Sequence, residues 1–316
     1  MDGIEHRIVA VNGINMHIAE KGDGPVILFL HGFPDIWYTW RHQINGLAAR
    51  GYRAVAPDLR GYGDTDAPPS KDAYTIFHIV GDLIALIDAL SLPQVFLVGH
   101  DWGALVAWYF CLFRPDRIKA LVNLSVCFRP RNPQRKPIET LRAVLGKDYY
   151  ICRFQEPGAA ESEFAMIDMG TLIKKSLTLR NPGPLIVPKG ALAESPPEPI
   201  TLPPWLCEED IDYYVSKFSK SGFTGGLNYY RNIDRNWELT APWTGVQVKV
   251  PVKFIVGDLD LTYTTLGAKD YIHNGSFKRD VPFLQDVVVM EGVGHFLNQE
   301  RSDEVTDHIY DFFQKF

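Results

Sequence analysis

The sequence predicts an α/β fold in which a mostly parallel sheet is covered by helices on both faces. Short apolar runs that suit buried strands alternate with helical patterns, and several of these runs end in loops that contain glycine. The alternation stops between Arg129 and Pro242, a segment with clustered prolines, many aromatic residues and no obvious core strand. We therefore expect a core domain at residues 1–128 and 243–316 and an inserted helical cap at residues 129–242.

The first elements follow from alternation and turn residues. Residues 6–11 and 15–19 alternate apolar and polar side chains around Asn12-Gly13, a pair typical of tight hairpin turns. Continuous apolar runs predict buried strands at 26–30 and 52–57. The same criteria predict the remaining elements: helices over 75–90 and from about 298 to 313, strands over 119–126, 252–256 and 287–290, and helical patches in the cap at 139–145 and 208–218.

The stretch from Val95 to Arg114 is predicted to change from strand to helix at Asp101. An apolar run leads into Gly99, and after Gly103 the sequence suits a helix, with no further Gly or Pro before Pro115. Glycines flank the central residue because a turn this sharp crowds the backbone and strains that residue. Hydrolases with this turn usually carry serine at its centre, whereas this chain carries aspartate.

An aspartate at this position restricts the chemistry. A solvated carboxylate is already ionised near neutral pH, whereas a serine needs a base to become a nucleophile. A carboxylate that attacks becomes the acyl part of its own ester, so the substrate must offer an electrophilic sp3 carbon with a leaving group, such as an epoxide or an alkyl halide. At this point the alternative remains that Asp101 merely caps the following helix.

Three residues at strand ends complete a catalytic pattern. Asp101, Asp260 and His295 each follow a predicted strand, in the order nucleophile, acid and base that is typical of the α/β-hydrolase fold. His295 would take a proton from water, and Asp260 would orient the imidazole and stabilise its charge. Asp258 is the alternative acid, whereas the loop after Val126 offers no carboxylate before Glu139.

Hydrolysis of an ester on Asp101 creates an oxyanion there, which needs N–H donors. By position, the candidates are the backbone N–H groups of Phe33, in a glycine-containing loop after the strand at 26–30, and of Trp102. His31 and His100 flank these two loops, and we interpret both as structural.

Composition excludes several classes of partner. The chain has 316 residues and a formal net charge of −6, and it has no dense run of Lys or Arg, so we expect no nucleic-acid or membrane partner. The cysteines have no metal-ligand spacing and predict free, buried thiols; they are Cys111, Cys127, Cys152 and Cys207. We expect no cofactor and no metal. The absence of a signal-peptide pattern and of a long apolar run predicts a cytoplasmic protein, either a monomer or a homodimer.

The motifs resemble those of soluble epoxide hydrolases, especially the plant enzymes that lack a fused phosphatase domain. The Asp-Trp-Gly turn alone is not specific, because haloalkane dehalogenases share it, but the shared stretches span nearly the whole chain. They are His31-Gly32-Phe33-Pro34, Trp40-Arg41-His42-Gln43, Asp58-Leu59-Arg60-Gly61-Tyr62-Gly63, Gly99-His100-Asp101-Trp102-Gly103, Tyr150 with Arg153-Phe154-Gln155-Glu156-Pro157-Gly158, Leu227-Asn228-Tyr229-Tyr230-Arg231-Asn232, Gly257-Asp258-Leu259-Asp260 and Gly294-His295-Phe296.

The resemblance implies conversion of epoxides to vicinal diols, with two cap tyrosines that donate to the epoxide oxygen. The matching positions are Tyr150 and Tyr230, which the residue types alone do not single out, because four further cap tyrosines could serve: Tyr149, Tyr213, Tyr214 and Tyr229. The resemblance also implies a cis peptide before Pro34. One departure is Asp35, where the plant pattern has Glu; if this carboxylate positions the hydrolytic water, its shorter side chain alters rate or regioselectivity.

Two alternative functions remain at this stage. A haloalkane dehalogenase has the same fold but needs N–H donors for a halide and has no use for two cap phenols. A non-catalytic ligand receptor on this fold would not need an intact triad. Fatty-acid epoxides and small aryl epoxides both suit an aromatic-lined pocket, so the sequence leaves the natural substrate and its stereochemistry open.

Overall fold

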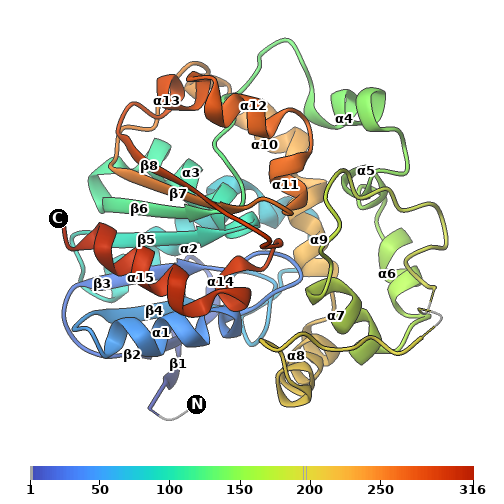
Figure 1. Cartoon of the computed structure of the whole chain (residues 1–316), viewed down its shortest axis with the longest axis horizontal. Helices are drawn as coiled ribbons and strands as arrows, with labels where there is room; N and C mark the ends of the chain where they lie inside the picture. Colours follow the sequence, from blue (N-terminus) through green and yellow to red (C-terminus); the bar gives the residue numbers. More distant parts are fainter. Residues whose placement is uncertain (1–2, 195, 197) are drawn as a thin grey trace.

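A computed structural model describes residues 3–194, 196 and 198–316. Across these residues eight strands form one sheet in the order β1-β2-β4-β3-β5-β6-β7-β8 (Figure 1). The pairs β1–β2 and β2–β4 are antiparallel, and all the other neighbours are parallel, as predicted. The strands are β1 (Glu5–Val11), β2 (Ile14–Lys21), β3 (Val26–Leu30), β4 (Arg53–Pro57), β5 (Val95–His100), β6 (Ile118–Leu124), β7 (Val252–Gly257) and β8 (Leu284–Met290).

Helices cover both faces of the sheet. In Figure 1, α1 and α15 pack together in front of it, while α2 and α3 lie behind it. Every residue of β3, β5 and β7 is buried, which explains their continuous apolar runs. The core helices are α1 (Arg41–Ala48), α2 (Ile76–Ala89), α3 (Trp102–Phe113), α11 (Leu261–Thr264), α12 (Ala268–His273), α13 (Ser276–Asp280), α14 (Leu297–Glu300) and α15 (Ser302–Phe313).

The predicted amino-terminal hairpin is confirmed. In the register of β1 and β2, Val11 pairs with Ile14 across a two-residue turn. Both turn residues have positive φ, 44° at Asn12 and 80° at Gly13, as this class of tight turn requires.

The predicted single helix at the carboxyl terminus is wrong in one respect, because it breaks between α14 and α15. At Arg301 the backbone leaves the helical region, with φ −129° and ψ 52°. In an unbroken helix the carbonyl of Asn298 would accept from the N–H of Ser302. Instead the side-chain amide of Gln43 donates to the carbonyls of Asn298, at 2.8 Å, and of Ser302, at 3.1 Å. A side chain distant in sequence thus replaces the helical bond, which local periodicity does not reveal.

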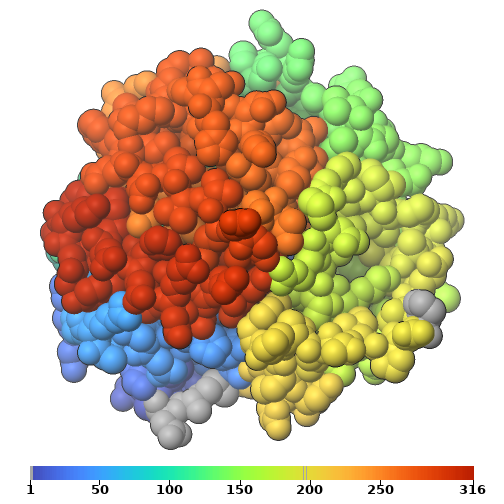
Figure 2. Space-filling model, in the orientation of Figure 1, coloured from blue at the N-terminus to red at the C-terminus, as the bar shows by residue number. Residues whose placement is uncertain are grey.

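The segment between β6 and β7 lies beyond the carboxyl ends of the parallel strands (Figure 1). In Figure 2 its green to yellow surface adjoins the blue and the orange-to-red surfaces of the rest of the chain. We call residues 129–242 the cap and the remainder the core; these exact boundaries stay a prediction. The helices of the cap are α4 (Pro137–Leu145), α5 (Tyr150–Arg153), α6 (Ala159–Phe164), α7 (Met169–Leu177), α8 (Glu208–Ser221), α9 (Thr224–Arg231) and α10 (Ile233–Leu239).

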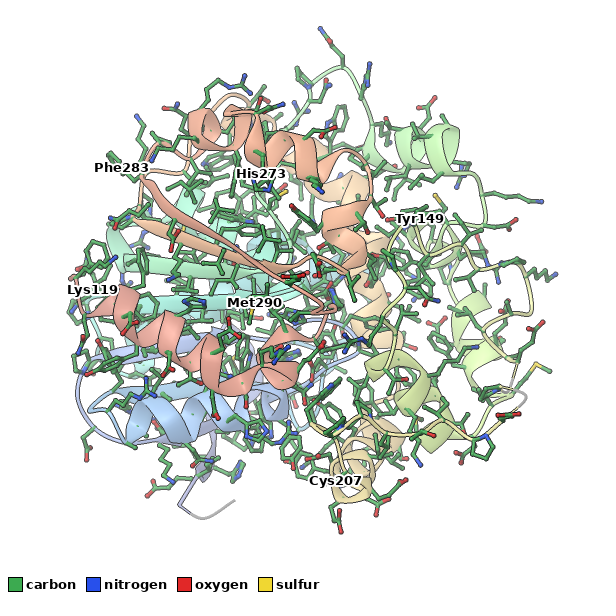
Figure 3. All side chains as sticks on the ribbon, viewed as in Figure 1. Lys119, Tyr149, Cys207, His273, Phe283 and Met290 are labelled. Carbon is green, nitrogen blue, oxygen red and sulfur yellow. The ribbon has the colours of Figure 1, made fainter. Side chains whose placement is uncertain are left out.

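All four cysteines lie within the described ranges and are free thiols. Three of them are buried, as predicted, but Cys207 is exposed. Cys207 occupies the position before α8 (Figure 3). Its Sγ lies 3.1 Å from Asp210 Oδ2, and its backbone N–H donates to the same oxygen. Among the described residues, no helix is both long and apolar enough to span a membrane.

Candidate active site

Asp101 lies on the predicted sharp turn between β5 and α3. Its backbone has φ 52° and ψ −118°, a region that L-residues rarely adopt. A Cβ on Gly103 would lie 2.1 Å from the carbonyl oxygen of Leu30, and one on Gly32 would lie 2.4 Å from the Cβ of Asp101. Glycine is therefore required at these two positions by the close approach of the chain. The turn projects the Asp101 carboxylate beyond the edge of the sheet.

The carboxylate of Asp101 lies between a backbone donor and the imidazole of His295. Its Oδ1 accepts a hydrogen bond from the N–H of Phe33 at 2.7 Å, and its Oδ2 lies 3.6 Å from His295 Nε2. The Phe33–Pro34 peptide is cis, as expected. Trp102, the other expected donor, is the first residue of α3 and directly follows the carboxylate.

His295 contacts Asp260 rather than Asp258. His295 Nδ1 lies 3.0 Å from Asp260 Oδ1, which also accepts from the N–H of Thr262 at 2.9 Å. The carboxylate of Asp258 instead accepts from the backbone N–H groups of Gly292, at 2.8 Å, and Val293, at 3.3 Å. Asp258 thus holds the loop that leads to His295, and it is Asp260 that can orient the imidazole.

Mutual charge stabilises the ionised forms of these three buried groups. Burial raises the pKa of Asp101, but His295, His100 and the N–H of Phe33 together lower it more, so the pKa lies below the usual value. Burial also raises the pKa of Asp260, but the charge of His295 and the hydrogen bonds to the carboxylate lower it, and the resulting pKa is about 2. Burial lowers the pKa of His295, but the charges of Asp260 and Asp101 raise it well above its usual value. The resting site therefore holds two carboxylates around an imidazolium.

His31 and His100 make contacts that fit a structural role. His31 Nε2 accepts from the N–H of Leu59 at 2.9 Å, and its Nδ1 lies 2.9 Å from the carbonyl of Gly32. His100 Nε2 lies 2.8 Å from the carbonyl oxygen of His295. Burial lowers the pKa of both histidines, to about 4 for His100, so both stay neutral near pH 7.

A cavity of about 170 Å³ joins the core residues to the cap. Asp101 and His295 line it from the core, and Tyr150 and Tyr230 line it from α5 and α9. The rings of the two tyrosines meet edge to face, with centroids 5.9 Å apart. Much of the remaining wall is apolar, including Phe33, Phe154, Leu172, Leu179, Val187 and Phe296.

The structure also separates these two tyrosines from the other four in the cap. The hydroxyl of Tyr213 accepts from Trp37 Nε1, and that of Tyr229 donates to the carbonyl of Arg60. Tyr214 donates to Asp35, and Tyr149 packs beside Tyr150 with ring centroids 4.9 Å apart. None of these four lines the cavity as described.

The comparisons with known proteins agree with this geometry. A family model described as the alpha/beta hydrolase fold matches residues 25–151. The chain is 62% identical to Epoxide hydrolase 1 of Siraitia grosvenorii and 61% identical to Epoxide hydrolase 2 of the same plant, and both matches cover 100% of each chain. The crystal structure of an epoxide hydrolase from Vigna radiata is 64% identical, covers 100% of this chain and 99% of its own, and superposes with a TM-score of 0.97. The chain belongs to the epoxide hydrolase family.

In this epoxide hydrolase, Asp35 is fully buried beside the cavity residue Pro34. Its Oδ1 accepts from the hydroxyl of Tyr214, at 2.7 Å, and from the N–H of Ile36, at 2.9 Å. Its Oδ2 has no hydrogen-bond partner among the described residues. Burial raises the pKa of Asp35 to about 7. The carboxyl group thus joins the core to α8 of the cap, a connection that the sequence motifs did not indicate.

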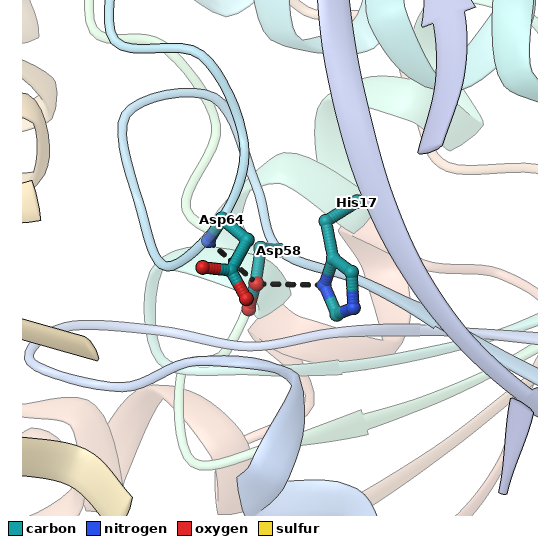
Figure 4. Close-up of side chains that lie close together, drawn as sticks. All are labelled: His17, Asp58 and Asp64. Carbon is teal, nitrogen blue, oxygen red and sulfur yellow. Dashed lines mark hydrogen bonds and ion pairs between the residues drawn. The ribbon is translucent and has the colours of Figure 1, made fainter. Parts of the chain in front are cut away.

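A second cluster, of one histidine and two aspartates, has the residue types of a metal site. Figure 4 shows His17, Asp58 and Asp64, whose potential ligand atoms lie within 4.8 Å of one another. However, Asp58 Oδ2 binds His17 Nδ1 at 2.8 Å and the N–H of Asp64 at 3.1 Å, and Asp64 is paired with Lys217 of α8. His17 Nε2 lies 3.0 Å from His6 Nδ1. These groups are satisfied by one another, so the cluster fits a structural role better than metal binding.

Sequence reasoning missed one polar residue beside the triad. Ser125 directly follows β6, and its hydroxyl lies 3.2 Å from His295 Nδ1. The residues after Val126 offer no carboxylate before Glu139, and a single hydroxyl after a strand by itself indicates no specific role. The position of Ser125 could have indicated its role. Strand β6 lies between β5 and β7 in the sheet, and these are the strands that Asp101 and Asp260 follow.

Proposed function

We propose that this epoxide hydrolase converts epoxides to vicinal diols through an ester on Asp101. One observation carries the proposal: a carboxylate held by a backbone N–H faces an imidazole on one side and two phenols across the same cavity. This set contains a nucleophile, a base and donors for an oxygen leaving group.

In the first step the Asp101 carboxylate attacks one epoxide carbon from the side opposite the ring oxygen. A carboxylate C–O bond forms, the carbon–oxygen bond of the ring breaks, and the ring oxygen takes a proton. Tyr150 and Tyr230 are suited to supply that proton, because burial raises their pKa well above the usual value and keeps both hydroxyls protonated.

In the second step His295 takes a proton from water, and the resulting hydroxide attacks the carbonyl carbon of the ester. Alkylation removes the charge of Asp101, which is one of the causes of the raised pKa of His295. The pKa of the imidazole therefore falls once the ester has formed, so it can give up its proton, which restores the phenol that was deprotonated in the first step, and then act as a base. Asp260 stabilises the positive charge that returns to the imidazole of His295 during this step.

The same step builds negative charge on a former carboxylate oxygen of Asp101. The N–H of Phe33, already 2.7 Å from Oδ1, is placed to stabilise it, and the N–H of Trp102 is the second proposed donor. When the intermediate collapses, the bond between the carbonyl carbon and the alcohol oxygen breaks, and that oxygen takes the proton that His295 removed from water. The released diol carries one oxygen from Asp101. The Oδ2 of Asp35 has no hydrogen-bond partner among the described residues, which supports the expectation that Asp35 holds a water.

Two phenols in the cap favour an epoxide over an alkyl halide. A departing alkoxide needs a proton, which neutral tyrosines supply, whereas a halide leaves without one. The close relatives named above are likewise epoxide hydrolases rather than dehalogenases or receptors.

The cavity wall supports apolar epoxides as substrates. At about 170 Å³ the cavity is smaller than the roughly 300–1,000 Å³ of typical ligand pockets, which favours a compact reacting centre. We propose small aryl epoxides and fatty-acid epoxides as the substrate classes, with roles in detoxification or fatty-acid epoxide metabolism. The cytoplasmic location and the monomeric or dimeric state stay predictions from the sequence.

A single-turnover reaction of styrene oxide in H2(18)O tests the ester route. We expect the diol of the first turnover to carry oxygen-16 and the heavy oxygen to appear on the peptide that contains Asp101, as read by mass spectrometry. Heavy oxygen in the first-turnover diol would mean that water attacks the ring directly. Halide release from 1-haloalkanes, without diol formation from epoxides, would favour the dehalogenase alternative.

A further inference from the structure

We propose that Ser125 is a positioning residue for the second step, in which its hydroxyl oxygen accepts, together with Asp260, the Nδ1–H of His295. This role rests on the proposed function, because it assigns Ser125 to hydrolysis of the ester and not to opening of the ring. The residue lies outside all the motifs that identified the site.

Two acceptors face the same imidazole nitrogen. Asp260 Oδ1 lies 3.0 Å and Ser125 Oγ lies 3.2 Å from His295 Nδ1, and all three residues are buried. Asp260 Oδ2 has no hydrogen-bond partner among the described residues, so this carboxylate contacts the imidazole through one oxygen only. A second acceptor therefore restricts the orientation of the imidazole ring more than Asp260 does alone.

The proton of the Ser125 hydroxyl has acceptors other than His295. Thr262 Oγ1 donates to the carbonyl oxygen of Ser125 at 2.8 Å, which uses its only hydroxyl proton. Thr262 Oγ1 can therefore accept from Ser125 in the 3.1 Å contact between the two hydroxyls, and the carboxylate of Asp260 is a second acceptor, because a hydrogen bond from Ser125 lowers its pKa. With either acceptor the proton of Ser125 points away from His295, and its lone pairs remain for the Nδ1–H of His295.

The backbone of Ser125 supports a role for this particular side chain. Its φ is +72°, and the N–H of Val126 donates to the carbonyl of Leu124 at 2.8 Å, which closes a three-residue turn around Ser125. Turns of this kind with a positive central φ are rare and strained in L-residues, and glycine would relieve that strain. Asp101, at the end of the neighbouring strand β5, is strained in the same sense.

The consequence is specific to one step. When His295 removes a proton from water, positive charge spreads over the imidazole, and an oxygen lone pair at Nδ1 stabilises it. Ring opening by Asp101 involves no proton transfer to His295. Loss of the Ser125 hydroxyl should therefore slow ester hydrolysis and leave alkylation nearly unchanged.

The test measures both steps in full-length Ser125→Ala and Ser125→Gly by rapid quench with styrene oxide and intact-protein mass spectrometry. In both variants we expect hydrolysis of the alkyl-enzyme to slow by about 10-fold or more, as for loss of a hydrogen bond to a charged group. We expect alkylation to stay within about 2-fold and the alkyl-enzyme to accumulate. The pH midpoint of hydrolysis should fall, because the imidazolium loses an acceptor. Glycine suits the positive φ, so Ser125→Gly separates loss of the hydroxyl from backbone strain.

Ser91→Ala is the matched control, because Ser91 is exposed and also has a positive φ, of 55°. It should keep both rates and the pH midpoint of the parent. Unchanged hydrolysis and pH midpoint in both Ser125 variants would overturn the proposal, as would an equal loss in both steps. If the parent enzyme itself forms no alkyl-enzyme, the proposed function fails first; if the parent forms it and the variants hydrolyse it normally, only the role of Ser125 fails.

Discussion

The core side and the cap side of the cavity are held in different ways. Asp101 directly follows strand β5, Asp260 lies three residues beyond the end of β7, and the two are fixed by backbone N–H groups of Phe33 and Thr262. The cap side depends on short helices and loop contacts. Tyr150 begins the four-residue α5, where its N–H donates to the carbonyl of Leu185, and Tyr230 is joined to the same region by Gln155.

This difference predicts a division of labour. Strand ends cannot shift without disturbing the sheet, so they suit groups whose charge and angle must be fixed for attack and base catalysis. Short helices joined by side chains tolerate adjustment, which suits donors that must follow substrates of different shape. Loss of a catalytic side chain in the core should therefore slow its step more than loss of a catalytic side chain in the cap.

The largest expected effect is that of Asp101→Ala. Without the carboxylate no ester can form, so diol formation should fall by at least about 10⁴-fold, as for removal of a catalytic nucleophile. Intact-protein mass spectrometry should detect no adduct with styrene oxide. Diol formation at an appreciable fraction of the parent rate would contradict the nucleophilic role and indicate direct attack by water.

The next largest effect is that of His295→Gln, which should separate the two steps. The ester should still form, but its hydrolysis should slow by about 10²–10⁴-fold, the usual contribution of a general base. Mass spectrometry should then detect about one alkyl group per enzyme, attached to the Asp101 peptide. Rapid multiple turnover by this variant would exclude His295 as the base.

On the cap side, Tyr150→Phe and Tyr230→Phe should each slow alkylation by about 10-fold to 100-fold, and the double variant should be slower than either. Each single variant leaves one buried, protonated phenol to donate to the ring oxygen. Rapid-quench measurement of the adduct checks this, with Tyr213→Phe, whose hydroxyl binds Trp37 outside the cavity wall, as the control. Loss of ring opening in one single variant, with no effect in the other, would contradict shared donation.

The same difference explains how far the sequence could be interpreted. Asp101, Asp260 and His295 were predictable because parallel strands end at one edge of a sheet, so residues after separate strands must meet there. Tyr150 and Tyr230 needed the family resemblance, since nothing in the spacing of six cap tyrosines shows which pair faces the cavity. The break at Arg301 and the contacts of Ser125 and Asp35 depend on side chains distant in sequence, which periodicity does not record.

The smallest expected effect is on stability and concerns Asp35, at the junction of core and cap. Burial raises its pKa from 3.8 to about 7 in the folded protein, so between these values the folded state binds a proton that the unfolded state has released. Its contribution to stability should therefore fall as the pH rises from about 4 to about 7, and change little above that. Asp35→Asn removes this titration, so the Tm of the variant relative to the parent should rise between pH 5 and pH 8.

The Asp35→Asn substitution also places an amide where Oδ2 has no partner, which lowers the stability by an amount that does not depend on pH. Only the change with pH in the Tm difference between variant and parent therefore reports the titration of Asp35. We expect a relative gain of at least about 2 °C, which corresponds to about 1 kcal/mol for a chain of this size. Asp72→Asn is the control for the amide substitution, since that side chain is 77% exposed. A difference in Tm that stays constant from pH 5 to pH 8 would mean that Asp35 is ionised throughout, and that Tyr214 joins the cap to a permanent charge in the core.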